Sequence, residues 1–123
     1  MTAKREIDVE ARLVSIKYHG DISMDDIRKN REALSSEPDF DSSYNMLVDM
    51  TEVSSFQLSS NEARQMAKST IFSKSSKIGI VVNSDFHFGI ARMFQSNKGA
   101  FGDRTLVFRE MSEARRWIAS DLD

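Results

Sequence analysis

The segment 85–88, which reads Asp-Phe-His-Phe, holds the residue types best suited to acid–base chemistry in this chain. His87 stands close after Asp85, and Arg92 follows roughly one helical turn later. A histidine beside a carboxylate can accept and donate protons near neutral pH. A hydrolase-type enzyme centred on His87 and Asp85 is therefore one of the three functional hypotheses that the sequence raises.

The rest of the sequence offers little that would complete such a site. The chain has two histidines and no cysteine, which excludes disulfides, thiolate metal sites, iron–sulfur clusters and cysteine nucleophiles. It contains no Gly-x-Ser-x-Gly elbow and no His-Glu-x-x-His motif. A phosphate-binding loop follows a strand and leads into a helix. Gly99 and Gly102 instead precede an expected strand, so they do not indicate a nucleotide site. We expect no metal, no cofactor and no enzymatic activity.

Asp49 and Ser59 are two further polar positions that could form a site. Asp49 lies near the end of the apolar run 46–50, and open α/β sheets bind ligands at the carboxyl ends of their strands. The simpler role for Asp49 is to accept backbone amides of the following loop. Ser59 stands three residues before Glu62 and so can cap a helix, whereas a phosphate on Ser59 would face the positive end of that helix.

Apolar side chains gather around an expected helix at about 86–96. If several of them prove exposed together, they mark a partner surface or an apolar pocket. The second hypothesis is therefore a carrier of a lipid or small apolar ligand, in which Arg92 meets an anionic head group. The candidate binding residues in this region are Asp85, Phe86, His87, Phe88, Arg92, Met93 and Phe94.

Hydrophobic periodicity predicts the elements that must position these residues. Alternation over 7–18 predicts an N-terminal hairpin that turns near Glu10 and ends at Gly20, and Ser23 begins a helix that runs to about Ser35. Pro38 then forces a loop. Strands are expected at 46–50, 77–82 and 105–108, and further helices at 59–71, about 86–96 and 114–122. This order predicts an α/β layer fold, with a mostly parallel sheet, an N-terminal hairpin or antiparallel edge, and about four helices.

Length and composition narrow the class of protein. A chain of 123 residues has room for a single domain, spanning 1–123. Its net charge of −2 and pI near 5.7 differ from the basic footprint of nucleic-acid binders. The longest strongly apolar run, Ile78–Val82, is far shorter than the roughly 20 residues of a membrane span. We therefore expect a cytoplasmic protein that neither binds nucleic acid nor crosses a membrane.

Taken in order, several short segments resemble the bacterial SpoIIAA-like group. This group comprises the STAS superfamily of anti-sigma-factor antagonists, together with relatives compared to the CRAL-TRIO lipid-exchange domain. The resemblance implies a SpoIIAA-like layer fold and a small, cytoplasmic, non-enzymatic module. The segments that carry it are Leu13–Tyr18, Gly20–Ser23, Glu37–Phe40, Leu47–Asp49, Phe88–Phe94, Val107–Arg109, Glu113-Ala114 and Trp117-Ile118.

Signalling members of that group carry a pattern of the kind Asp-Leu-Ser-Gly-Val-x-x-x-Asp-Ser-Ser-Gly, in which a partner kinase phosphorylates the second serine. The equivalent stretch here is 49–61, and Ser59 takes the position of the phospho-acceptor. Gln57 and Leu58 stand where the group has its aspartate, and Ser60 or Asn61 where it has its last glycine. The resemblance thus makes Ser59 a candidate phosphorylation site in a diverged motif.

The leading hypothesis is a non-catalytic STAS-like module that acts by binding. Its expected surface is the carboxyl edge of the sheet, formed by Asp49–Ser59 and Asp85–Phe94. The partner would be an unidentified protein or a small apolar ligand. An unpaired sheet edge or exposed aromatic side chains would also permit a homodimer.

Overall fold

The structure is a computed structural model and describes residues 3–57, 61, 75–83 and 105–120. Five strands and two helices lie in this part of the chain. In chain order they are β1 (Ala3–Asp8), β2 (Leu13–Ser23), α1 (Met24–Ser35), β3 (Asn45–Gln57), β4 (Ile78–Val81), β5 (Thr105–Phe108) and α4 (Met111–Ala119).

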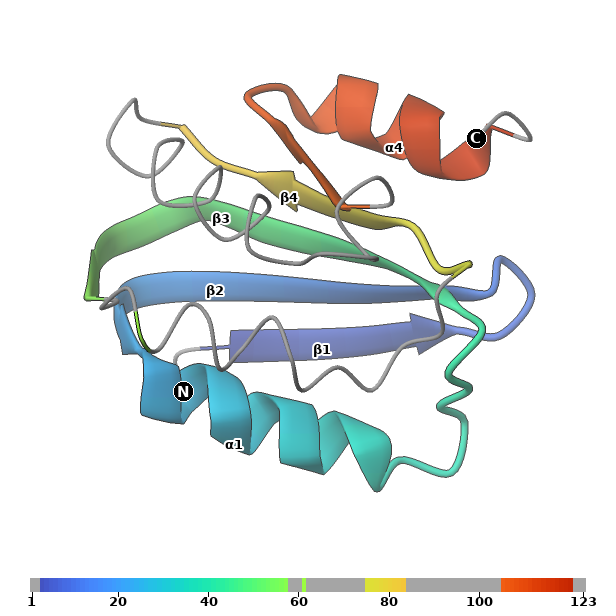
Figure 1. Cartoon of the computed structure of the whole chain (residues 1–123), viewed down its shortest axis with the longest axis horizontal. Coiled ribbons are helices and arrows are strands. Elements are labelled where there is room, and N and C mark those ends of the chain that lie inside the picture. Colours follow the sequence, from blue (N-terminus) through green and yellow to red (C-terminus); the bar gives the residue numbers. More distant parts are fainter. Residues whose placement is uncertain (1–2, 58–60, 62–74, 84–104, 121–123) are drawn as a thin grey trace.

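The strands form one sheet in the order β1-β2-β3-β4-β5 (Figure 1). β1 runs antiparallel to β2, whereas β2, β3, β4 and β5 are parallel neighbours. This arrangement confirms the predicted α/β class and the mostly parallel sheet with an N-terminal hairpin at one edge. The strand at 105–108 and the helix start after Ser23 agree with the sequence prediction, and the observed β4 lies within the expected strand at 77–82.

Two apolar layers cover the two faces of the sheet, because successive side chains of a strand point to opposite sides. Val48 and Ile80 lie in the larger cluster, to which α1 contributes Leu34. Their neighbours Leu47 and Val81 lie in the smaller cluster, to which α4 contributes residues. The central strands are therefore buried on both faces, as the continuous apolar run at 46–50 predicts.

Gly79 allows α4 to lie close against β4. A Cβ atom added at this position would lie 3.1 Å from Cδ1 of Ile118 and 3.6 Å from Cε2 of Phe108. Trp117 of α4 packs on the same side, with its ring centroid 5.7 Å from that of Phe108. The missing side chain at Gly79 thus makes room for the helix.

Two predicted strand ends are wrong. β2 continues through Gly20 to Ser23, and β3 has 13 residues instead of the short strand expected at 46–50. The extension of β3 is polar along much of its length, which in a sequence reads as a loop. It remains a strand because it stays paired with β2, and because Val53 is buried against the larger apolar cluster.

The helix count also differs from about four, since the described residues contain α1 and α4 alone. The two other expected helices, at 59–71 and about 86–96, lie almost entirely outside the described residues. The last predicted helix position, Leu122, lies outside them as well.

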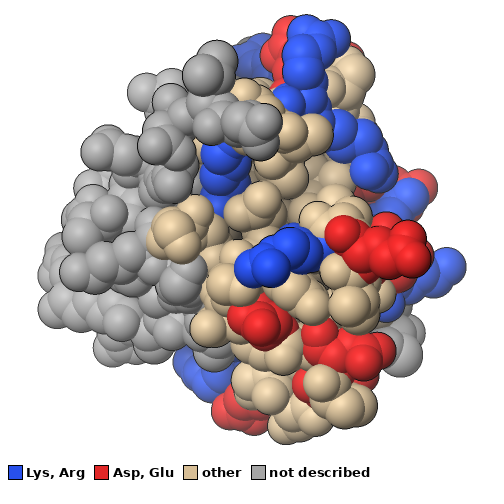
Figure 2. Space-filling model, turned by 90° about the vertical axis from the view of Figure 1, so that its right-hand side faces the viewer, with Lys and Arg blue, Asp and Glu red and all other residues tan. Residues whose placement is uncertain are grey.

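The amino end of the parallel strands is closed by the β1–β2 turn. Arg12, with a φ of 54°, donates from Nη2 to Oγ of Ser43 at 2.7 Å, and its guanidinium lies 5.6 Å from the ring centre of Tyr44. Figure 2 looks onto this end, where basic and acidic side chains are interspersed among neutral ones. The visible described surface therefore has mixed charge rather than a field of one sign.

Candidate functional site

The sheet has a step where β4 ends and β3 continues. Asp49 of β3 is opposite Val81, the last residue of β4. Beyond it, the segment Met50–Gln57 pairs with β2 on one side, and no described strand pairs with its other side. We call the residues at this place, Asp49, Thr51 and Asn83, the sheet step. It lies at the carboxyl ends of β4 and β5, whereas β2 and β3 continue beyond it. The carboxyl ends of parallel strands are where open α/β sheets bind their ligands.

Hydrogen bonds connect Asp49 and Asn83 of the sheet step to Thr51. Oδ1 of Asp49 accepts hydrogen bonds from the backbone N of Thr51 at 2.9 Å and from its Oγ1 at 2.7 Å. The side-chain amide of Asn83, just past β4, donates to the backbone oxygen of Thr51. Asp49 thus accepts a nearby backbone amide, although this amide belongs to the same strand and not to a loop.

Irregular pairing between β2 and β3 explains why Asp49 can reach Thr51. Lys17 is opposite Asp49, but His19 is opposite Glu52, so β3 holds one extra residue there. A second register shift follows between Gly20 and Asp21. Gly20 has a φ of 76°, which a residue without Cβ adopts at little cost. Such bulges bend a strand and turn its side chains away from the regular alternation.

Two polar pairs join β2 to β3 around these bulges. Nζ of Lys17 lies 3.0 Å from Oε2 of Glu52, and Oγ of Ser55 donates to Oδ1 of Asp21 at 2.8 Å. The hydrogen bond to Glu52 raises the pKa of Lys17 above its usual value. All four residues lie on the two strands that continue past the end of β4, so the surface beyond the sheet step is polar.

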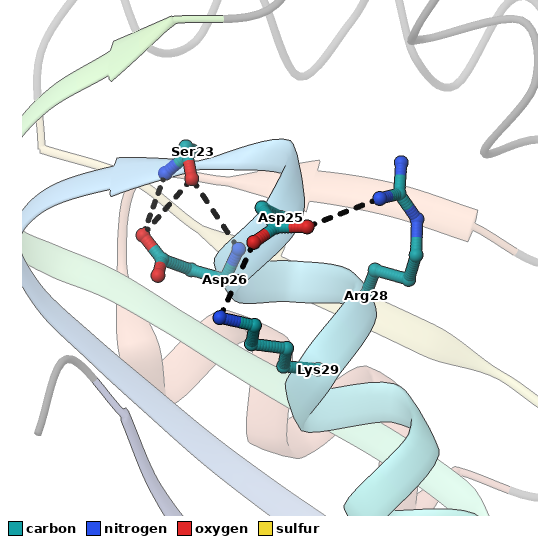
Figure 3. Close-up of polar contacts among 5 residues, drawn as sticks. All are labelled: Ser23, Asp25, Asp26, Arg28 and Lys29. Carbon is teal, nitrogen blue, oxygen red and sulfur yellow. Dashed lines mark hydrogen bonds and ion pairs between the residues drawn. The ribbon is translucent and has the colours of Figure 1, made fainter.

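The amino end of α1 lies at the same edge of the sheet. The carboxylates of Asp25 and Asp26 occupy this end of the helix (Figure 3). Oγ of Ser23 accepts from the backbone N of Asp26 at 3.3 Å, and Oδ2 of Asp26 accepts from the backbone N of Ser23 at 2.9 Å. Asp25 pairs with Arg28 at 3.1 Å and Lys29 at 3.3 Å. Because carboxylates occupy the positive end of the helix, an anionic ligand is disfavoured there.

The comparisons with known proteins agree with this fold. The model of the SpoIIAA-like family matches residues 13–119. The chain belongs to the SpoIIAA-like family. A search of the curated proteins finds no match.

Among solved structures, this SpoIIAA-like chain is similar to an uncharacterized protein of the DUF3478 family from Shewanella loihica PV-4, described as having a SpoIIAA-like fold. The TM-score is 0.59 and the sequence identity 15%, over 94% of this chain and 93% of that one. At this identity the likeness shows a shared fold. The match to the family model confirms the family resemblance drawn from the sequence.

Of the site residues predicted from sequence, the structure describes Asp49 alone. Ser59 and the remaining candidates, Asp85, Phe86, His87, Phe88, Arg92, Met93 and Phe94, lie outside the described residues. Within the described ranges, no group of three or more His, Asp or Glu side chains could hold a metal ion. No helix in those ranges is long and apolar enough to cross a membrane.

Sequence reasoning missed Thr51 and Asn83 as members of the site. An Asp followed two residues later by Thr is a pattern that often forms a local side-chain-to-backbone turn, and 49–51 has it. That signal predicts the contact between Asp49 and Thr51. The contact from Asn83 depends on the alignment of β3 with β4, which local sequence does not encode.

Proposed function

We propose that this SpoIIAA-like chain is a non-catalytic module that binds a protein partner along β3 beyond the sheet step. One observation carries the proposal: β3 extends past β4, so on the side away from β2 no described strand pairs with Met50–Gln57. Of the backbone groups on this stretch, the carbonyl of Thr51 already accepts from Asn83. A strand edge without a paired neighbour can accept an extended segment of a partner through main-chain hydrogen bonds.

The side chains along this stretch favour a polar partner segment. Glu52 and Ser54 are exposed, and Thr51 and Ser55 are half-buried. Residues with hydroxyl, amide or basic side chains on the partner would match these groups, and main-chain bonds would supply the affinity.

The contacts of the polar groups support binding over catalysis. Asp49 is held by Thr51, Lys17 by Glu52, and Asp21 by Ser55. A general base must reach the proton that it abstracts, whereas these groups shape and stiffen the two long strands. The family assignment supports a STAS-type module. Its location in the cytoplasm stays a prediction from sequence. A regulatory role through Ser59, and a pocket for an apolar ligand around Phe86–Phe94, stay predictions from sequence.

Site-specific photo-crosslinking in the native host tests the proposal. A photoreactive amino acid replaces Ser54, which is exposed on β3, and in the matched control it replaces Glu113, which is exposed on α4. We expect a discrete protein adduct from position 54 and none from position 113. Absence of an adduct at position 54, or the same adducts at both positions, would overturn the proposal. Native mass spectrometry that finds a retained apolar molecule in place of a protein adduct would favour the carrier.

A further inference from the structure

The outer edge of β1 is a second strand edge, at the opposite end of the sheet from β5 (Figure 1). β1 pairs with β2 on one side over its whole length, from Ala3 opposite Tyr18 to Asp8 opposite Leu13. No described strand pairs with its other side. Proteins commonly guard such an edge with charged side chains, and β1 carries four of them.

The charges of β1 are ordered along the strand and do not simply alternate. The basic residues Lys4 and Arg5 come first, and the acidic residues Glu6 and Asp8 follow. When two copies of such a strand run antiparallel, the basic half of each faces the acidic half of the other. A parallel alignment would instead place like charges together, which destabilises a strand pair. The charges of two β1 strands therefore match when the strands run antiparallel and repel when they run parallel.

We propose that two copies of this chain associate through their β1 strands, antiparallel about a two-fold axis at Glu6, to give one continuous sheet. This alignment places Lys4 opposite Asp8 of the partner twice, because the axis repeats every contact. It also places Val9 opposite Ala3. Val9 follows β1 directly and is 50% exposed, a large apolar side chain at the surface beside this edge.

The alternative axis at Arg5 fits the structure less well. It would place the two Arg5 side chains against each other, although each is already engaged: Nη1 donates to Oδ1 of Asn30 at 2.8 Å, and Nη2 lies 3.5 Å from Oε1 of Glu37. It would also leave Asp8 and Val9 outside the pairing. With the axis at Glu6, the unfavourable contact is between two exposed Glu6 side chains, which water screens.

Sedimentation velocity of the purified full chain over a range of concentrations tests the inference. We expect a reversible monomer–dimer equilibrium that Lys4→Glu weakens by about tenfold, since two attractive pairs become repulsive. The double variant Lys4→Glu/Asp8→Lys restores the pairing. Arg115→Glu changes the net charge equally at an exposed position of α4, which packs against β4 and β5 at the other end of the sheet, and leaves the equilibrium unchanged.

Glu6→Gln separates the two axes. It tightens the dimer when two Glu6 side chains face each other, and weakens it when the axis lies at Arg5 and Glu6 faces Lys4. Circular dichroism checks that each variant is folded. A chain that stays monomeric at all concentrations, a dimer unaffected by Lys4→Glu, or a dimer weakened by Glu6→Gln overturns the inference. None of these results bears on the partner surface of β3, so the two proposals fail separately.

Discussion

The ammonium group of Lys77 lies over the ring of Trp117, 5.4 Å from its centre, and donates to the backbone oxygen of the same residue at 3.0 Å. It also donates to the backbone oxygen of Ser120 at 2.5 Å. Lys77 is 5% exposed and directly precedes β4. The last carbonyl groups of a helix lack internal partners and carry partial negative charge, so this buried cation ties the end of α4 to the sheet.

Replacing Lys77 with Met keeps the apolar stem and removes the charge. We expect Lys77→Met to lower the free energy of unfolding by about 2 kcal/mol, because carbonyl groups at the end of α4 lose a charged donor while they stay partly buried. Chemical denaturation measures the change. Lys29→Met is the control: Lys29 pairs with Asp25 at an exposed site, where such pairs contribute about 0–1 kcal/mol. Equal stability of the two variants would contradict the role given to Lys77.

Replacing Thr with Val should have opposite effects on the free energy of unfolding at positions 105 and 51. Thr105 is fully buried and its Oγ1 has no hydrogen-bond partner among the residues that the structure describes, whereas Oγ1 of Thr51 donates to Asp49. We expect Thr105→Val to stabilise the protein by about 1 kcal/mol and Thr51→Val to destabilise it by about 1 kcal/mol. Thermal or chemical unfolding of both variants measures the difference. A loss of stability in Thr105→Val would mean that the hydroxyl is satisfied.

Gly20 should resist substitution because of its backbone conformation alone. Its φ is 76°, and an added Cβ would meet no atom within 4 Å. We expect Gly20→Ala to cost about 1 kcal/mol, and Gly20→Asn to cost less because Asn tolerates the left-handed region. Equilibrium unfolding of the two variants provides the measurement. If Gly20→Ala and Gly20→Asn both leave the free energy of unfolding unchanged, a residue without Cβ is not required at position 20.

Tyr18 should make the protein less stable in alkali. Its side chain is buried, its hydroxyl accepts from Nδ2 of Asn30 at 3.2 Å, and burial raises its pKa above the usual value. A pKa raised in the folded state means that the neutral phenol is favoured there. The stabilisation is therefore complete below the unfolded pKa of about 10 and is lost as pH rises through the folded pKa.

The Tyr18→Phe variant isolates this effect. We expect the difference in unfolding free energy between the wild type and Tyr18→Phe to change as pH rises above the unfolded pKa of about 10, because the wild type loses its stabilisation there. The variant has no phenol at position 18, so its remaining pH dependence comes from other groups. A difference that stays constant as pH rises would show that Tyr18 ionises as easily in the folded chain as in the unfolded one.

Local patterns were sufficient to predict the parts of the fold that depend on neighbouring residues. Ser23 with Asp26 predicts the start of α1, and the structure has both hydrogen bonds of that capping box. The apolar runs around Val48 and Ile80 predict strands buried on two faces, which is what β3 and β4 show there. These features depend on residues a few positions apart, so a single sequence carries them.

Pairing between distant segments decided what local patterns could not. The polar residues after Asp49 read as a loop, but β2 supplies hydrogen-bond partners as far as Gln57. Likewise, Asn83 reaches Thr51 only because β4 stops opposite Asp49. The sheet step is a consequence of unequal strand lengths, and strand length is set by the neighbouring strand as much as by the residues themselves.

Hydrogen exchange of the chain alone and in complex with its captured partner tests the proposed function most directly. The measurement follows the backbone amides of Met50–Gln57, with those of α4 as the internal reference. If a partner segment pairs with β3 beyond the sheet step, those of these amides that point away from β2 exchange more slowly in the complex, and those of α4 are unchanged. Unchanged exchange over Met50–Gln57, with protection elsewhere, would contradict the proposal.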